Sequence, residues 1–361
     1  MPKRTHTADV LKGIAILLMI QVHVVELFAS HELAASSVGK VFMFLGGPPV
    51  APLFMVLFGY FISVSHKSKQ QLIVRGLKIF ALGMLLNLAF NFNLINSVMR
   101  GLLQIDILPF VFGADILQFA GLSLMVIALL KNVLEQQLVV TLIIIIASVL
   151  LGQYLVAYIP EDNSLKYMTA FFYGSAKWSY FPLFPWLAYP LTGIALYQLQ
   201  QRYQIDVTLT NKTNRALAIG ALLFVILTIG YAITVTSDLP SYYHHGILFF
   251  LWTIVFLIAY SVCVHTITEH IGTTLLFQYL TWLGKHVTLI YIIQWIIIGN
   301  IATEIYKTIT SPLYLALCFV GVLVASSGIC YLVLQLKELL KSKPTSSLNH
   351  PLPLSPLRLT Y

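Results

Sequence analysis

The segment Asp9-Val10-Leu11-Lys12-Gly13-Ile14-Ala15-Ile16-Leu17-Leu18-Met19-Ile20-Gln21-Val22-His23 opens the first long apolar run of the chain, yet it contains ionisable side chains. On a helix, Lys12 and His23 fall within about 20° of each other and lie roughly 16 Å apart along the axis. Asp9 and Glu26 project within about 60° of the same direction. The segment therefore predicts an apolar helix with one polar face. Ionisable groups inside a membrane helix indicate a functional site.

The composition is that of a polytopic membrane protein. Of the 361 residues, 58% are hydrophobic and only 9% are charged, and the mean hydropathy is +0.86. Soluble domains carry about 25% charged residues, so a soluble enzyme is excluded. Apolar runs of about 20 residues recur along the whole chain, and each can cross a bilayer as a helix. The three cysteines, Cys263, Cys318 and Cys330, have neither a disulfide nor a metal-ligand spacing, so no metal is expected.

The apolar runs predict an all-α fold with about ten transmembrane helices. Their approximate bounds are 9–29, 50–65, 72–91, 114–130, 138–159, 180–199, 215–236, 247–265, 283–303 and 314–336. Residues 1–340 are therefore expected to form one transmembrane domain. The Pro- and Ser-rich segment 341–361 is expected to be a disordered cytoplasmic tail.

The distribution of basic residues predicts the orientation of the chain. With a cytoplasmic N-terminus, the inner loops receive most of the lysines and arginines. The outer loops receive only Lys40, Arg100, Lys166, Lys177 and Lys307. The positive-inside rule then places both termini in the cytoplasm. Because the basic residues are scattered between apolar runs, the net charge of +8 is a topology signal, and no nucleic-acid partner is expected.

Several motifs resemble a known family. Asp9-x-x-Lys12-Gly13-x-Ala15, followed by His23, resembles the first helix of the transmembrane acyltransferase superfamily, whose acyltransferase-3 branch separates an arginine from a histidine by ten residues. Later segments resemble bacterial relatives of heparan-alpha-glucosaminide N-acetyltransferase, and they occur in the same order. These segments are Ala51-Pro52-Leu53-Phe54 with Gly59, Arg75-Gly76-Leu77, Asp115-Ile116-Leu117-Gln118-x-x-Gly121-Leu122, Tyr180-Phe181-Pro182-Leu183-Phe184-Pro185-Trp186, and Leu283-Gly284-Lys285-x-x-x-Leu289-x-Tyr291. The resemblance covers most of residues 8–300.

The resemblance implies a multi-pass acyltransferase of the cell (inner) membrane. Its donor would be an acyl-CoA, usually cytoplasmic acetyl-CoA, and its acceptor a hydroxyl or amine of a carbohydrate. The chain departs from the family pattern at Lys12, which replaces an arginine and lacks its planar fork, and at Gln294, which stands where a histidine is common. In the lysosomal branch of the family, the reactive histidine lies in the loop after the first helix. The nearest counterpart here is His31, which is out of register, so His23 is the preferred reactive histidine.

The residues themselves suit such a transfer. A CoA donor carries anionic phosphates on a long thioester arm, so it needs cations at the cytoplasmic mouth and a base deep inside. Lys12 and Arg75, with Asp9 beside Lys12, are the expected donor-binding residues, and Lys78 is a further candidate for the positive charge. His23 can act as general base or can attack the thioester and carry the acetyl group transiently, and both routes stay open. The structural alternatives are a helix-end ion pair for Asp9 and Lys12, an inner-surface anchor for Arg75, and a histidine that only bridges helices.

Two further residues are candidates for catalysis near the outer end of the fourth helix. Asp115 can orient His23 or receive the acceptor's hydroxyl, and Gln118 lies on a neighbouring face. The alternative for Asp115 is a carboxylate that is favoured at a helix N-terminus by the helix dipole. The pair His244-His245 is expected to be solvated or interfacial rather than a ligand pair.

Two other functions stay open from the sequence. A transporter or flippase for a small polar solute would line its path with the polar face of the first helix and move its substrate unmodified. A degenerate family member would act as a scaffold, which the changes at Lys12 and Gln294 keep open. An acyltransferase must instead bind CoA from the cytoplasm and need His23 for turnover. The sequence gives neither the acceptor, nor the choice of O- or N-acylation, nor the oligomeric state.

Overall fold

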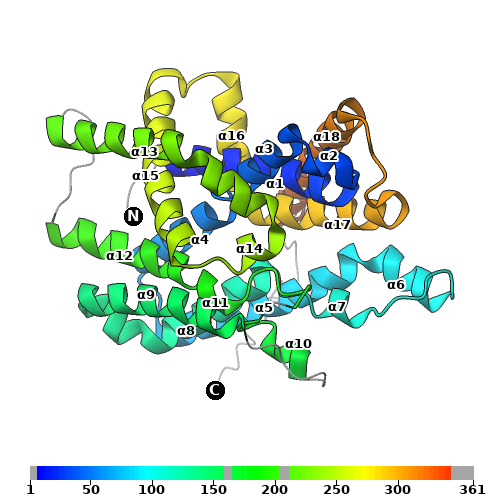
Figure 1. Ribbon diagram of the computed structural model, residues 1–361, viewed down its shortest axis with the longest axis horizontal. Helices are drawn as coiled ribbons and strands as arrows, with labels where there is room; N and C mark the ends of the chain where they lie inside the picture. The colour runs from blue at the N-terminus through cyan, green and yellow to red at the C-terminus, as the bar shows by residue number, and fades with distance from the viewer. Residues whose placement is uncertain (1–5, 158–164, 175, 204–210, 343–361) are drawn as a thin grey trace, which may run out of the picture.

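A computed structural model describes residues 6–157, 165–174, 176–203 and 211–342, and it is built from helices (Figure 1). In this part of the chain, nine helical segments are long and apolar enough to cross a membrane. They are α1 (His6–Phe28), α3 with α4 (Ser37–Gly46 and Ala51–Val64), α5 (Lys69–Phe90), α8 (Ile116–Gln136), α9 (Leu138–Leu155), α13 (Lys212–Ser237), α15 (Ile247–Ile271), α17 (Val287–Ile305) and α18 (Pro312–Ser342). The predicted all-α, multi-pass fold is confirmed. The sidedness of the termini and the domain bounds stay predictions, and the predicted tail, apart from residues 341 and 342, lies outside the described residues.

Shorter helices fill the connections between these segments. They are α2 (His31–Ala35), α6 (Phe92–Met99), α7 (Leu108–Val111), α10 (Leu165–Thr169), α11 (Leu183–Trp186), α12 (Ala188–Tyr203), α14 (Leu239–Tyr243) and α16 (Leu275–Lys285). The predicted helices end at residue 265 and resume at residue 283, so most of α16 falls in a segment where no helix was predicted.

The bounds of the predicted helix 180–199 are wrong. The chain is extended at Pro182, forms the short α11, and begins α12 only at Ala188. Proline has no N–H to donate and its ring clashes with the preceding turn, so Pro182 and Pro185 prevent one continuous helix. The 16-residue α12 packs against α4 and α9. A Cβ on Gly59 of α4 would lie 1.8 Å from the Pro190 carbonyl oxygen, so the two backbones meet directly.

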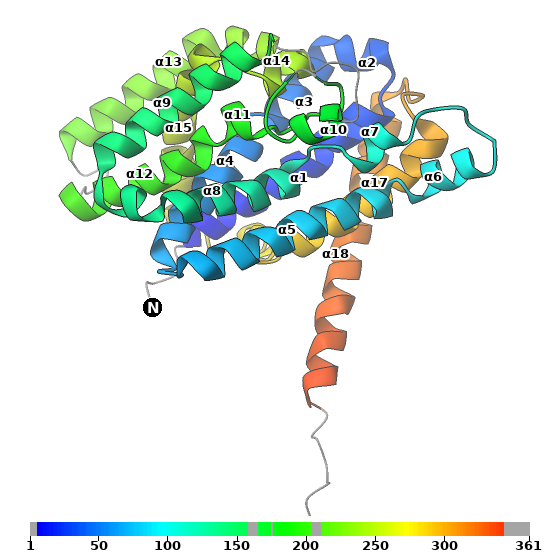
Figure 2. The same cartoon turned by 90° about the horizontal axis from the view of Figure 1, so that it is seen from below.

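Helix α1 is the element around which the bundle packs. It contacts α3, α15, α16, α17 and α18. A Cβ on Gly13 would lie 1.9 Å from the Leu280 carbonyl oxygen, and a Cβ on Gly284 would lie 1.8 Å from the Asp9 carbonyl oxygen. Glycine at both positions therefore lets α16 lie against the first turns of α1. Figure 2 shows α18, in orange, leaving the rest of the bundle toward its C-terminal end.

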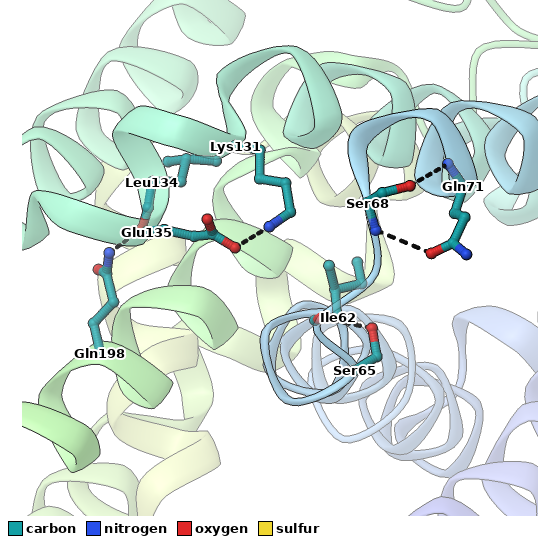
Figure 3. Close-up of polar contacts among 8 residues, drawn as sticks. All are labelled: Ile62, Ser65, Ser68, Gln71, Lys131, Leu134, Glu135 and Gln198. Carbon is teal, nitrogen blue, oxygen red and sulfur yellow. Dashed lines mark hydrogen bonds and ion pairs between the residues drawn. The ribbon is translucent and has the colours of Figure 1, made fainter.

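Helix α5 begins at a capping box in the connection after α4 (Figure 3). The Ser68 hydroxyl accepts a hydrogen bond from the Gln71 N–H at 3.3 Å, and Gln71 Oε1 accepts one from the Ser68 N–H at 3.0 Å. At the end of α4, the Ser65 hydroxyl donates to the Ile62 carbonyl at 2.8 Å. A capping box satisfies two otherwise unpaired N–H groups and fixes where a helix starts. This start places Arg75 in the second turn of α5.

Candidate active site

A cavity of about 1290 Å³ follows α1 and is lined by Lys12, His23 and Glu26 from that helix. Lys12 and Glu26 are separated by about 21 Å along the helix axis, at about 1.5 Å per residue. Between them the wall is mainly apolar and aromatic, and it includes Phe54, Phe58, Leu82, Phe90 and Trp295. The polar face predicted for the first helix therefore faces this cavity.

One end of the cavity is cationic. Its wall contains Lys12 and Arg75, together with Lys285 and Lys337 from the ends of α16 and α18. Lys12 Nζ lies 2.7 Å from Asp9 Oδ1, and Asp9 is only 2% exposed, behind the wall. The ion pair thus holds Lys12 in place and neutralises part of its charge. The remaining positive charge at this end of the cavity comes from Arg75, Lys285 and Lys337. Lys337 carried no sequence signal, because only the path of α18 brings it to this end.

His23 lies partway along the cavity and is held from two sides by α17. Its Nδ1 is 3.2 Å from Gln294 Oε1, and its ring packs on Trp295 with centroids 4.1 Å apart. The amide oxygen accepts, so Nδ1 carries the proton and Nε2 keeps its lone pair. Among the described residues, Nε2 has no hydrogen-bond partner, and His23 lines the cavity. This is the orientation that a general base or a nucleophile needs.

The other end of the cavity carries carboxyl groups. Asp115 is the N-cap of α8, where its Oδ1 accepts from the Ile116 N–H at 2.7 Å and its Oδ2 accepts from the Tyr291 hydroxyl at 3.0 Å. The Ala114 N–H donates to the Trp178 carbonyl at 2.8 Å, which ties this cap to the outer connection. The capping alternative is therefore realised at Asp115, and the same side chain also lines the cavity.

Gln118 lies elsewhere. Its amide nitrogen is 3.9 Å from the Met84 sulfur, its Oε1 has no partner among the described residues, and the side chain is buried between α5 and α8 close to Gly83. The cavity wall of the described residues does not include it. A role for Gln118 stays a prediction from the sequence.

The expectation that both residues of His244-His245 are solvated or interfacial is wrong for His245. This ring is 2% exposed; its Nδ1 donates to the Tyr242 carbonyl at 2.8 Å, and its Nε2 accepts from the Tyr189 hydroxyl at 2.9 Å. Burial lowers the pKa of His245 to about 4. No sequence pattern indicates this burial, since it comes from aromatic neighbours such as Trp186, whose ring centroid is 5.2 Å away. His245 is structural.

The fold and the cavity define a multi-pass membrane protein with an internal site that joins a cationic end to a histidine and carboxyl groups. A family model described as heparan-alpha-glucosaminide N-acetyltransferase, catalytic, matches residues 4–225, more than half of the chain. The chain belongs to this family of membrane acetyltransferases, and the resemblance noted in the sequence is confirmed. The match ends before α17, which supplies Gln294 and Trp295. No curated protein and no solved structure matched the chain.

Proposed function

We propose that this protein transfers an acetyl group from cytoplasmic acetyl-CoA to a hydroxyl or amine of a sugar-type acceptor, with His23 as the reacting side chain. The observation that carries the proposal is the position of His23, between a cationic end and a carboxyl-bearing end of one cavity. Membership of the acetyltransferase family supports the reaction class. The multi-pass fold and the bacterial resemblance support a cell (inner) membrane location.

The residues fit acetyl-CoA as donor substrate. Lys12, Arg75, Lys285 and Lys337 can bind its phosphates, because Lys and Arg both pair with phosphate oxygens. Asp9 orients Lys12 through the 2.7 Å ion pair. The largely apolar wall that follows can hold the uncharged arm and bring the thioester toward His23.

In the direct route, His23 Nε2 takes the proton of the acceptor's hydroxyl or amine while that atom attacks the thioester carbon. A C–O or C–N bond forms, the C–S bond breaks, and the sulfur leaves with the electron pair and receives the proton from His23. In the second route, Nε2 itself attacks the thioester carbon, the C–S bond breaks, and CoA leaves as the thiolate. The acceptor then attacks the acetyl carbon, the bond from that carbon to Nε2 breaks, and the proton lost by the acceptor goes to the CoA thiolate. Asp115 lies where it can receive the acceptor, and Gln118 remains a candidate for an indirect role.

One experiment tests the proposal and separates the routes. The purified protein in detergent is mixed with acetyl-CoA labelled in the acetyl group, with and without a panel of amino and neutral sugars. Label on a sugar confirms the transfer. Label on a peptide that contains His23, formed without a sugar and chased onto one afterwards, identifies the acyl-histidine route; its absence during active transfer identifies the direct route. Consumption of no acetyl-CoA with any sugar contradicts the proposal.

A further inference from the structure

A second acidic side chain, Glu26, lines the cavity close to His23 and has no part in the steps above. The two residues are three positions apart on α1, and side chains at this spacing lie on the same face of a helix. In the part of the chain that the structure describes, the Glu26 carboxylate makes no hydrogen bond and no ion pair. It is a free acceptor of hydrogen bonds that faces the cavity.

The surroundings of Glu26 hold a second carboxyl group and several hydroxyl groups. The Asp115 carboxyl acts on Glu26 as a like charge, while Lys307 acts as the opposing charge. Asp115 and Tyr243 also line this end of the cavity. Both Asp115 oxygens already accept hydrogen bonds, so Glu26 is the carboxylate with free capacity.

Two hydroxyl groups at this end also lack partners. Tyr242 and Thr303 line the cavity, and their oxygen atoms are buried without a hydrogen bond among the described residues. Buried polar groups are normally paired, and an unpaired one costs free energy. A ligand with several hydroxyl or amine groups can satisfy these oxygens and the Glu26 carboxylate together.

We propose that Glu26 is an acceptor-binding residue that, with Asp115, selects neutral or cationic sugars and rejects anionic ones. The inference rests on the proposed function and adds the charge preference of the acceptor subsite. A sugar hydroxyl or ammonium group donates a hydrogen bond to the Glu26 side chain, which faces the cavity with no partner among the described residues. A carboxylate or sulfate on the acceptor would instead meet two carboxyl groups in a largely apolar cavity, which is unfavourable.

The test compares wild type with Glu26→Gln and with Glu304→Gln, which removes the same charge from an exposed position one residue after Thr303. Binding of glucose, glucosamine and glucuronate, three sugars of similar size, is measured by tryptophan fluorescence, because Trp295 lines the cavity. Acetyl transfer to each sugar and the affinity for CoA are measured in parallel.

Wild type and Glu304→Gln are expected to bind glucosamine and glucose at least about tenfold more tightly than glucuronate. Glu26→Gln is expected to lose most of this discrimination and to raise the acceptor KM about tenfold, with a smaller change in kcat and unchanged CoA affinity. Equal binding of the three sugars by wild type, no sugar binding at all, or an unchanged pattern in Glu26→Gln overturns the inference. Sugar discrimination without acetyl transfer would leave the subsite intact and reject the proposed function alone.

Discussion

Gln294 Oε1 of α17 lies 3.2 Å from His23 Nδ1 of α1, so the residue that departs from the family pattern is the hydrogen-bond partner of the proposed reactive histidine. Gln294 is fully buried, with 0% exposure. The contact fixes which ring nitrogen carries the proton and therefore which one is free to react.

Replacing Gln294 with Leu tests this contact. Leucine keeps the approximate volume but cannot accept from Nδ1, so the ring loses its fixed orientation and a buried N–H is left unpaired. We expect kcat to fall by about 10²-fold or more, in the range of a lost acid–base contribution. The affinity for CoA, measured by equilibrium binding, should not change.

The matched control for this variant is Gln278→Leu, at an exposed position of α16 whose side chain, within the described part of the chain, bonds only to the Thr273 carbonyl. It should leave kcat unchanged. Full activity of Gln294→Leu would show that the hydrogen bond to His23 has no part in turnover.

The cationic end of the cavity gives a second prediction. Lys12→Gln and Arg75→Gln should each weaken CoA binding by about ten- to a hundredfold, because a charge-assisted hydrogen bond to phosphate contributes roughly 1.5–3 kcal/mol. Lys12→Arg should retain binding or improve it, since the guanidinium can grip phosphate in two places. Binding is measured by titration with CoA at fixed ionic strength.

Lys78 provides the control on the same helix as Arg75. It is exposed and is not among the described residues that line the cavity. Lys78→Gln should leave the affinity for CoA within twofold of wild type, by the small effect that surface charges usually have. Equal losses of CoA affinity in Lys78→Gln and Arg75→Gln would mean that CoA binding depends only on the overall positive charge of this surface.

The packing of α16 on α1 gives a prediction on stability. Ala at Gly13 or Gly284 would place a Cβ within 2 Å of a backbone oxygen, at 1.9 and 1.8 Å. The helices must then separate, and we expect each variant to lose about 1–3 kcal/mol or more and to melt several degrees lower in detergent. Gly220→Ala on α13, where a Cβ meets nothing within 4 Å, should be neutral or slightly stabilising. A melting temperature unchanged by Gly13→Ala would contradict this packing.

These glycines also show what could be predicted from the sequence. Hydropathy gives the transmembrane segments because a bilayer requires about 20 apolar residues in each, and the polar stripe on α1 follows from helical periodicity alone. Helix α16 could not be predicted in this way, because a helix of 11 residues is too short to cross a membrane. Its position depends on contacts with Gly13, which lies far away in the sequence.

The site shows the same limit. Lys12, His23 and Arg75 could be nominated from charge and spacing, and all three line the cavity. Gln294 and Lys337 could not, because an amide or a terminal lysine on another helix has no local pattern that relates it to α1. Only the packing of α17 and α18 brings them to the cavity.

Burial of His245 predicts a pH dependence of stability. Its pKa is about 4 in the folded protein and 6.5 without burial, so the unfolded chain binds the proton more readily. The free energy of unfolding is therefore highest above about pH 6.5 and falls as the pH falls toward 4. For this difference in pKa the loss is about 3 kcal/mol. The melting temperature in detergent should fall across this interval.

His245→Gln should reduce this fall in melting temperature, because glutamine does not titrate there, while His244, whose pKa burial also lowers to about 4, keeps its own contribution. His270→Gln is the control: His270 is exposed on α15 and bonds within its own helix to the Thr266 carbonyl at 2.7 Å. It should keep the wild-type profile. An identical profile for His245→Gln and wild type would assign the pH dependence to other groups.

The most direct test of the account is release of free CoA from acetyl-CoA by the purified protein, wild type beside His23→Ala, with an amino or neutral sugar as acceptor. We predict that wild type releases CoA in step with sugar acetylation. The variant should bind CoA with the same affinity, since the cationic end lies about 16 Å away along α1, yet release it at least about 10²-fold more slowly. Turnover by His23→Ala at the wild-type rate would contradict the central role of His23.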